Sequence, residues 1–378
     1  MLRVRVELGP RSYDVRIGHD ILPALGAAAR RAGLGRHVLI VADGHVADSH
    51  APLVASSLHA AGFAAHLVVM PPGEGSKSLA GAERLYGACL DCALDRAGAI
   101  VAVGGGVCGD LAGFVAATYM RGIPWMHVPT TLLAQIDASV GGKVAVDHPR
   151  AKNLIGAFHQ PRLVWCDTQT LDSLPLPDLA AGMAEAVKHG ILADPRYYGF
   201  VRRHRADLLA RDPRALVRLV SGSVRIKAAV VAGDEREDLG VAAAQEDQRA
   251  AGARSRMVLN LGHTLGNNLE AVAGYGMLRH GEAVAIGLVA AGRLALRHGL
   301  WSRRWQAELE ETLQGLGLPT RIPGLGLGEL LAAMRVDKKA VGGANRWILP
   351  VRPGSVVVRS DVAAAAITAV LREMGASD

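Results

Sequence analysis

The sequence predicts an α/β protein in two parts: an N-terminal half with a doubly wound parallel sheet, and a mainly helical C-terminal half. Continuous apolar runs at 37–42 (HVLIVA) and 99–103 (AIVAV) are typical of parallel strands buried on both faces. Strands that alternate with helical patterns favour a doubly wound sheet. From about Leu171 onward, long helical patterns dominate. We therefore divide the chain into domains at 1–170 and 171–378.

Composition supports a globular protein and limits its partners. The chain has 378 residues, of which 50% are hydrophobic and 20% charged, enough for two domains with buried cores. The net charge is +7, but the basic residues are scattered and aromatic residues are few. We therefore expect no nucleic-acid partner. A basic pocket for an anionic small molecule accounts for part of the excess of basic over acidic residues.

Targeting and redox signals are weak. No apolar run reaches the roughly 18 residues of a membrane helix, and the first residues alternate like a strand rather than a signal peptide. We expect a cytoplasmic protein with no membrane partner. Cys89 and Cys92 form a CxxC, but no second pair completes a zinc site. Buried free thiols are the preferred interpretation, because 79–94 has helical spacing.

The remaining elements follow from apolar spacing and from turn residues. Strands are expected at 2–8, 12–17, 37–42, 65–70, 99–103, 125–129, 348–350 and 355–359. Helices of the C-terminal half are expected at 178–192, 194–209, 213–232, 281–298 and 303–313. Asp178 and Asp194 are predicted helix N-caps. The polar, Ala-rich segment 240–255 reads as an insertion that loops into solvent.

Two stretches of the N-terminal half point to a ligand. The strand 99–103 runs into a glycine-rich turn, 104–110, that opens an Ala-rich helix. Such a turn lets backbone N–H groups approach a phosphate, although the GxGxxG fingerprint is absent. The second stretch, 135–153, concentrates glycine, lysine and acidic residues. We interpret it as a site segment; an ordinary surface loop is the alternative.

The C-terminal half contains a candidate metal site. Asn260–Glu282 holds two histidines, His263 and His280, and Glu185 lies upstream in the motif GMAE. Two imidazoles and one carboxylate are a ligand set expected of a catalytic zinc with open positions. The alternative is a pair of histidines that are merely hydrogen-bonded at helix ends.

Taken together, the motifs resemble the sugar phosphate cyclase superfamily, and most closely the 3-dehydroquinate synthase family. They are GGGVCGDLAGFVAATYMRG (104–122), PTTLLAQIDASVGGKVAVDHPRAKNLIGAFHQP (129–161), GMAEAVKHGI (182–191), LNLGHTLGN (259–267), LRHGEAVAIG (278–287) and DKK (337–339). The resemblance covers nearly the whole chain. It implies an NAD-binding Rossmann-like α/β domain (1–170), an all-α metal- and substrate-binding domain (171–378), and a homodimer.

The resemblance also implies site residues. The metal ligands, for Zn²⁺ or Co²⁺, are Glu185, His263 and His280. The substrate contacts are Asp137, Lys143, Asn153, Lys188, Lys227, Arg256, Asn260 and Lys338. The NAD contacts are Asp43, Gly73, Glu74, Lys77, Gly106, Val107, Gly109, Asp110, Thr130, Thr131, Lys143, Lys152 and Thr170. Lysines and an arginine suit a sugar acid phosphate, because lysine holds phosphate as a point charge and arginine grips a carboxylate.

The reaction that the resemblance implies converts 3-deoxy-D-arabino-heptulosonate 7-phosphate to 3-dehydroquinate and phosphate. NAD oxidises a ring hydroxyl, which acidifies the neighbouring C–H so that phosphate is eliminated. NADH then returns the hydride, the ring opens and an enol closes the carbocycle. NAD is recycled, so no net redox change is expected.

One position departs from the family pattern, in which a second histidine follows the first by four residues. Here it is Asn267, which cannot carry a proton near neutral pH. A related cyclase of secondary metabolism, such as an amino-dehydroquinate synthase, and an NAD-dependent polyol dehydrogenase therefore stay as alternatives. Retention of Lys227, Arg256 and Asn260 favours a substrate with a carboxylate.

Overall fold

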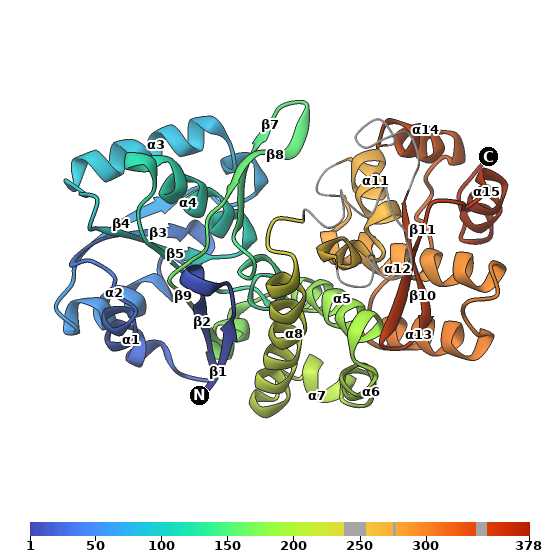
Figure 1. Cartoon of the computed structure of the whole chain (residues 1–378), viewed down its shortest axis with the longest axis horizontal. Helices are drawn as coiled ribbons and strands as arrows, with labels where there is room; N and C mark the ends of the chain where they lie inside the picture. Colours follow the sequence, from blue (N-terminus) through green and yellow to red (C-terminus); the bar gives the residue numbers. More distant parts are fainter. Residues whose placement is uncertain (238–254, 275–276, 338–345) are drawn as a thin grey trace. The chain divides into compact units, whose positions relative to one another are not determined.

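A computed structural model describes residues 1–237, 255–274, 277–337 and 346–378. The predicted insertion 240–255 lies outside these residues except for Ser255, and so does Lys338. The chain divides into two compact units: Met1–Leu174 with Arg211–Ala232, and Pro175–Ala210 with Gly233–Asp378. We describe each unit by itself (Figure 1).

The first unit is built on a seven-stranded sheet in the order β1-β2-β9-β6-β5-β3-β4. Its strands are β1 (Leu2–Val6), β2 (Tyr13–Gly18), β3 (His37–Asp43), β4 (Ala64–Met70), β5 (Ala99–Gly104), β6 (Trp125–Pro129) and β9 (Leu163–Asp167). β1 and β2 form the predicted antiparallel hairpin, and the other ladders are parallel. The α/β prediction is therefore confirmed.

Helices cover both faces of this sheet (Figure 1). They are α1 (Leu25–Arg31) and α2 (Ala51–Ala60) on one face, and α3 (Leu79–Asp91) and α4 (Gly106–Thr118) on the other. α8 (Pro213–Gly233) also belongs to this unit. Val38 and Ile40 of β3 belong to one buried cluster with residues of α1 and α2, whereas Leu39 and Val41 belong to another with residues of α3 and α4. Alternate side chains thus enter opposite cores, which explains why positions 38–42 of the strand are all apolar.

Three strands of the first unit have no counterpart in the prediction. β7 (Lys143–His148) and β8 (Ala151–Phe158) pair as an antiparallel hairpin inside the stretch interpreted as a site segment. β9 joins β2 to β6, and all five of its residues are buried. Its sequence, LVWCD, is a short apolar run of the type that predicted β3 and β5, so a signal for it was present.

The second unit is mainly helical, as predicted. Its helices are α5 (Leu176–Ala193), α6 (Pro195–Arg203), α7 (Arg205–Leu209), α11 (His263–Ala273), α12 (His280–Arg297), α13 (Arg303–Gly315), α14 (Leu327–Asp337) and α15 (Ala364–Glu373). The two short strands expected near the end form the hairpin β10 (Trp347–Arg352) and β11 (Ser355–Arg359).

The two predicted N-caps have different outcomes. Asp194 caps α6, because its carboxylate accepts hydrogen bonds from the N–H groups of Arg196 and Tyr197 at 2.8 and 3.1 Å. The prediction for Asp178 is wrong: α5 begins two residues earlier, and Pro175 occupies the cap position. Asp178 lies in the first turn and accepts a hydrogen bond from Arg279 Nε at 2.8 Å.

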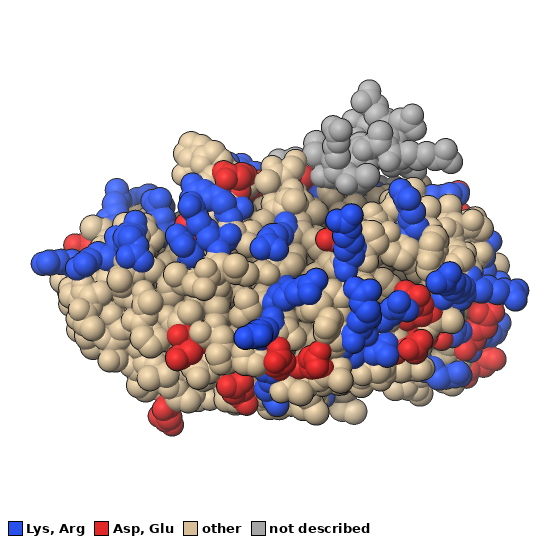
Figure 2. Space-filling view, turned by 90° about the horizontal axis from the view of Figure 1, so that it is seen from below, with Lys and Arg blue, Asp and Glu red and all other residues tan. Residues whose placement is uncertain are grey.

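Surface properties agree with the composition. Lysine and arginine side chains are dispersed over the face shown in Figure 2, with acidic side chains among them. No helix in the described part of the chain combines the length and the apolarity needed to cross a membrane. Cys89 is buried, Cys92 is partly buried, and neither takes part in a disulfide.

Candidate active site

Glu185, His263 and His280 converge within the second unit. Oε1 of Glu185 lies 3.6 Å from Nε2 of His263 and 3.7 Å from Nε2 of His280. The carboxylate is fully buried, and the two imidazole rings meet edge to face with centroids 5.2 Å apart. These three residues were predicted from the sequence, and the fold brings them together from three different helices.

Glycine residues make this convergence possible. His263 and His280 are the first residues of α11 and α12, and Gly262 precedes α11 with φ of +82°. A Cβ at Gly281 would lie 1.8 Å from the carbonyl oxygen of Ala181 in α5. The start of α12 can therefore touch the backbone of α5 only because a side chain is absent there.

The three candidate ligands perturb one another electrostatically. Burial favours the neutral form of Glu185, but Lys188, His280 and His263 outweigh it and hold the carboxyl pKa well below its usual range. Burial lowers the pKa of His263 to about 4. Burial also opposes protonation of His280, but the carboxylates of Glu185 and Glu270 prevail and raise its pKa to about 10. Glu185 is thus held as an anion.

The spacing of these atoms suits a metal ion better than it suits hydrogen bonds. Separations of 3.6 and 3.7 Å exceed hydrogen-bonding distance. Tetrahedral ligands at about 2.0–2.1 Å from a common centre would lie about 3.3 Å apart. Nδ1 of His263 lies 3.2 Å from the carbonyl oxygen of Leu261, so Nδ1–H can donate there and leave Nε2 as the electron-pair donor. The residues present therefore fit a divalent cation.

In the first unit, predicted NAD and substrate residues form a charged cluster. Lys77 is buried, and its ammonium lies 2.6 Å from Oδ2 of Asp110 and contacts the side-chain oxygen of Asn153. Burial raises the pKa of Asp110 despite the neighbouring lysine. Lys152 and Lys77 lie 3.8 and 3.9 Å from Oε1 of Glu74. The loop holding Gly73 and Glu74, the start of α4 and the β7–β8 hairpin therefore meet at these side chains.

The glycine turn has both a possible ligand-binding role and a packing role. Gly105 caps α4, and Gly106 and Val107 are its first two residues, whose N–H groups have no carbonyl of the helix to bind. The N–H of Gly109 donates to the carbonyl of Gly105 at 3.1 Å. At Gly109, however, a Cβ would lie 2.3 Å from the ring of His127. Packing alone therefore requires glycine at this position.

The other predicted NAD contacts lie at the ends of strands. Asp43 ends β3 and accepts hydrogen bonds at 2.9 Å from the backbone and the ring of His45. Thr130 and Thr131 follow β6, and Thr130 donates its N–H to the carbonyl of Gly104 at 3.0 Å. Thr170 is buried: its hydroxyl donates to the carbonyl of Asp167 and accepts from Gln135. That hydroxyl is therefore already used within the fold.

Two predicted substrate residues of the first unit form an ion pair. The ammonium of Lys227, on α8, donates at 2.6 Å to both the backbone carbonyl and the carboxylate of Asp137. Asp137 lies in a π-helical turn, Ala134–Ala138. Lys143 is exposed at the start of β7. Residues 90 positions apart are thus brought together at Asp137.

The remaining predicted substrate residues lie in the second unit. Lys188 is buried and contacts the carboxylate of Glu185 one helical turn away. Arg256 is buried, and its guanidinium donates to the carbonyl of Glu235 at 2.9 Å. Asn260 and Asn267 are exposed. Asn267, which departs from the family pattern, therefore presents its amide at the surface of α11.

Glu270 was not predicted from the sequence, and Asp147 lies in the predicted site segment 135–153 without an assigned role. Oε2 of Glu270 lies 2.8 Å from Nδ1 of His280. It follows His263 by seven residues, and that two-turn spacing on α11 is a signal that could have found it. Asp147 accepts the N–H of Asn153 at 2.8 Å, and Asn153 has φ of +60°. Asp147 therefore supports the unusual backbone conformation of a predicted substrate residue.

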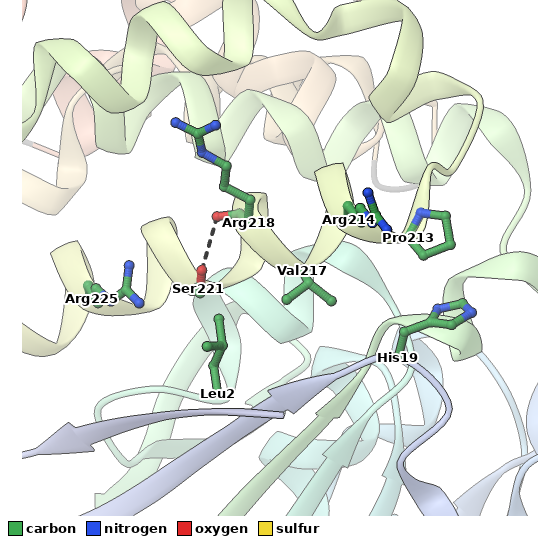
Figure 3. A pocket seen from close by; sticks show the side chains of 8 residues that line it. All are labelled: Leu2, His19, Pro213, Arg214, Val217, Arg218, Ser221 and Arg225. Atoms are coloured by element: carbon green, nitrogen blue, oxygen red, sulfur yellow. Dashed lines mark hydrogen bonds between the residues drawn. The ribbon is translucent and has the colours of Figure 1, made fainter.

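A surface groove of about 440 Å³ in the first unit lies apart from the predicted residues (Figure 3). Its lining is Leu2, His19, Pro213, Arg214, Val217, Arg218, Ser221 and Arg225. The hydroxyl of Ser221 donates to the backbone carbonyl of Arg218 at 3.2 Å. Its arginines are exposed, and no predicted site residue is among the eight.

Comparison with known proteins assigns the family. Models of the N-terminal and C-terminal parts of 3-dehydroquinate synthase match residues 67–181 and 182–340. The chain is 47% identical to 3-dehydroquinate synthase from Symbiobacterium thermophilum over 365 residues, which cover 96% of this chain and 98% of that protein.

Solved structures agree. A 2-deoxy-scyllo-inosose synthase complexed with carbaglucose-6-phosphate, NAD⁺ and Co²⁺ has a TM-score of 0.85 at 25% identity, over 99% of this chain and 100% of that one. A 2-epi-5-epi-valiolone synthase from Streptomyces hygroscopicus subsp. jinggangensis with NAD⁺ and Zn²⁺ bound has a TM-score of 0.83 at 26% identity, over 99% of both chains. On sequence and structure together, the chain belongs to the 3-dehydroquinate synthase family.

Proposed function

We propose that this enzyme, a lyase that eliminates phosphate and closes a carbocycle, acts on 3-deoxy-D-arabino-heptulosonate 7-phosphate to give 3-dehydroquinate, with recycled NAD and a divalent cation. The observation that carries the proposal is the buried Glu185 carboxylate, which faces two imidazole nitrogens at 3.6 and 3.7 Å. It stands in a chain 47% identical to a 3-dehydroquinate synthase. This family membership favours the cyclase over the polyol dehydrogenase and over the amino-dehydroquinate synthase.

The cation would be held by Glu185, His263 and His280. When bound, it would supply Lewis acidity to the alcohol and carbonyl oxygens of the substrate. Zn²⁺ and Co²⁺ both suit a set of two imidazoles and one carboxylate. The metals carried by the two cyclases of similar fold support both ions equally.

NAD would be bound by the first unit, through the glycine turn at the start of α4, Asp43 and the Lys77 cluster. Its role is to accept a hydride and return it. The free N–H groups of the first turn of α4 suit the pyrophosphate. Lys77 and Lys152 supply positive charge beside it. The NAD⁺ present in both structural neighbours supports this assignment.

Charged side chains would orient the substrate. Lys188 is buried beside Glu185, so its ammonium would stabilise negative charge on a substrate oxygen bound there. Arg256 suits the substrate carboxylate, because a guanidinium can donate two parallel hydrogen bonds. Lys227 is held by Asp137 and offers a second positive charge. Lys143, Asn153, Asn260 and Lys338 complete the proposed set.

We also keep two further proposals from the sequence, a homodimer and a cytoplasmic location. The family resemblance supports the first, and the biosynthetic role of the relatives supports the second.

The decisive experiment is phosphate release by purified protein with substoichiometric NAD and either Zn²⁺ or Co²⁺. We expect release from the heptulosonate phosphate without NADH accumulation, because the hydride is returned within each turnover. Glu185→Gln should reduce release to background. Asp361→Asn, which removes one partner of an exposed ion pair with Arg359, should leave it unchanged.

Release only from a neutral sugar phosphate would assign another cyclase activity. NADH accumulating in proportion to substrate would assign a dehydrogenase.

A further inference from the structure

The ring of His280 lies between two carboxylates. Nε2 is 3.7 Å from Oε1 of Glu185, and Nδ1 is 2.8 Å from Oε2 of Glu270. The first separation is too long for a hydrogen bond, whereas the second is a short and favourable one. The two ring nitrogens therefore have different roles: Nε2 faces the metal ligands, and Nδ1 is anchored to protein.

Glu270 is placed for this contact by the geometry of α11. It follows His263 by seven residues, so both side chains project from one face of the helix, two turns apart. Gly266 lies between them on that face, and a Cβ there would lie 3.2 Å from the carbonyl oxygen of Ala283 in α12. The absence of a side chain lets α12 approach this face closely, which brings the His280 ring within reach of Glu270.

Partial burial strengthens the hydrogen bond between Glu270 and His280. The Glu270 side chain is 17% exposed and that of His280 is 31% exposed, so the pair is partly shielded from water. A hydrogen bond from an imidazole N–H to a carboxylate fixes the tautomer and the rotation of the ring. His263 is anchored in the same way, but by a backbone carbonyl that no substitution removes. Of these two imidazoles, only His280 depends on a side chain for its anchor.

We propose that Glu270 is a positioning residue, which orients His280 so that Nε2 points at the cation bound by Glu185 and His263. This inference rests on the metal assignment made under Proposed function. Glu270 lies on the Nδ1 side of the ring, away from Glu185, and takes no part in the cluster of candidate metal-binding groups. Its effect is therefore exerted through His280.

The chain offers a matched control at the same helix end. Glu282 is the third residue of α12, and its carboxylate accepts the N–H of Arg279 at 2.8 Å, which caps the helix. Glu270 and Glu282 thus each place a carboxylate at the start of α12, but only Glu270 touches the imidazole. Glu282→Gln weakens the cap of α12 but leaves the hydrogen bond between Glu270 and the His280 ring in place.

The test is a titration of metal-stripped protein with Co²⁺, with affinity measured by chelator competition and geometry by the visible absorption of the bound ion. Glu270→Ala and Glu270→Gln should weaken Co²⁺ binding by roughly 10- to 100-fold and alter the absorption spectrum. Glu282→Gln should keep the wild-type affinity within about twofold and the wild-type spectrum, even where its melting temperature falls.

The outcomes separate the claims. Wild-type affinity and an unchanged spectrum in both Glu270 variants would overturn the positioning role. Weakening in Glu282→Gln equal to that in Glu270→Gln would also overturn it, because helix capping would then explain the effect. A wild-type protein that binds no Co²⁺ would instead contradict the metal assignment. If Glu270→Ala does not fold, the nearly isosteric Glu270→Gln decides.

Discussion

At the scale of single residues, Asp167 shows how a buried carboxylate can organise a remote part of the chain. It is fully buried at the end of β9, and its oxygens accept the N–H groups of Asp20, Ile21 and Leu22 at 2.8, 2.6 and 2.9 Å. These bonds tie the exit of the N-terminal hairpin to the end of β9. The partners are about 145 positions away in the sequence, so neither spacing nor composition could reveal them.

His127, another buried polar residue, makes stability depend on pH. It lies on β6 with 1% of its surface exposed, and burial lowers its pKa to about 4. Between that value and the ordinary value of 6.5, the unfolded chain binds a proton that the folded chain does not. Stability from this residue is therefore intact above pH 6.5 and is lost as the pH falls towards 4.

We expect this residue alone to lower the free energy of unfolding by about 2 kcal/mol at pH 5 relative to pH 8. His127→Gln does not titrate, so its urea-denaturation midpoint should change less between these pH values than that of the wild type. The comparison uses the pH dependence of each protein, so a constant loss of stability in the variant does not matter. Equal pH dependence in both proteins would contradict the role of His127.

At the scale of elements, close contact between helices positions the three proposed metal ligands. α5, α11 and α12 approach one another where glycine replaces a side chain, at Gly262, Gly266, Gly281 and Gly287. Each ligand is then held by a helix backbone rather than by a loop. A site carried on rigid elements keeps its geometry better than a site carried on loops.

Gly281→Ala tests this arrangement. The added Cβ would overlap the Ala181 carbonyl, so the start of α12 must move away from α5 and carry His280 with it. We expect a loss of roughly 1–3 kcal/mol in the free energy of unfolding, together with weaker metal binding. Thermal melting and Co²⁺ titration would measure the two effects.

The matched control is Gly199→Ala in α6, where the nearest atom to an added Cβ is 3.9 Å away. That substitution should stabilise the helix slightly. If Gly281→Ala changes neither the free energy of unfolding nor the metal affinity, the start of α12 accommodates the added Cβ, and the prediction is wrong.

Sequence patterns predicted these elements better than they predicted contacts between them. The long helices and the central parallel strands follow from apolar spacing, which burial on one or both faces imposes. The residue types and the family motifs both indicated Glu185, His263 and His280, which the fold brings together. Glu270 was missed because it acts through the ring of His280. Asp147 lies in the predicted site segment 135–153, but its contact with the backbone N–H of Asn153 could not be predicted. Asp178 was assigned to a cap wrongly, because Pro175 begins α5 earlier than the apolar spacing indicates.

At the scale of the whole molecule, the proposed ligands divide between the two units. The proposed NAD contacts fall in the first unit and the three proposed metal ligands in the second. A ligand that binds only the folded state stabilises it by about 2.7 kcal/mol at 100 times its dissociation constant. The metal should therefore stabilise above all the unit that holds its ligands.

Hydrogen exchange would display this effect along the chain. Adding Zn²⁺ to metal-stripped protein should slow exchange most strongly in α5, α11 and α12, and much less in the strands of the seven-stranded sheet. His263→Ala should show no such change, because one of the three ligands is absent. Equal slowing throughout both units would contradict a metal site confined to the second.

The return of the chain to the first unit at α8 affects the order in which that unit can be completed. During synthesis the sheet and its first four helices emerge well before α8, and the Asp137 carboxylate gains the Lys227 ammonium only once α8 has been made. A fragment that ends at Leu174 lacks α8 and this ion pair. The natural unit for truncation, domain transfer or circular permutation is therefore discontinuous, and it has to include Arg211–Ala232.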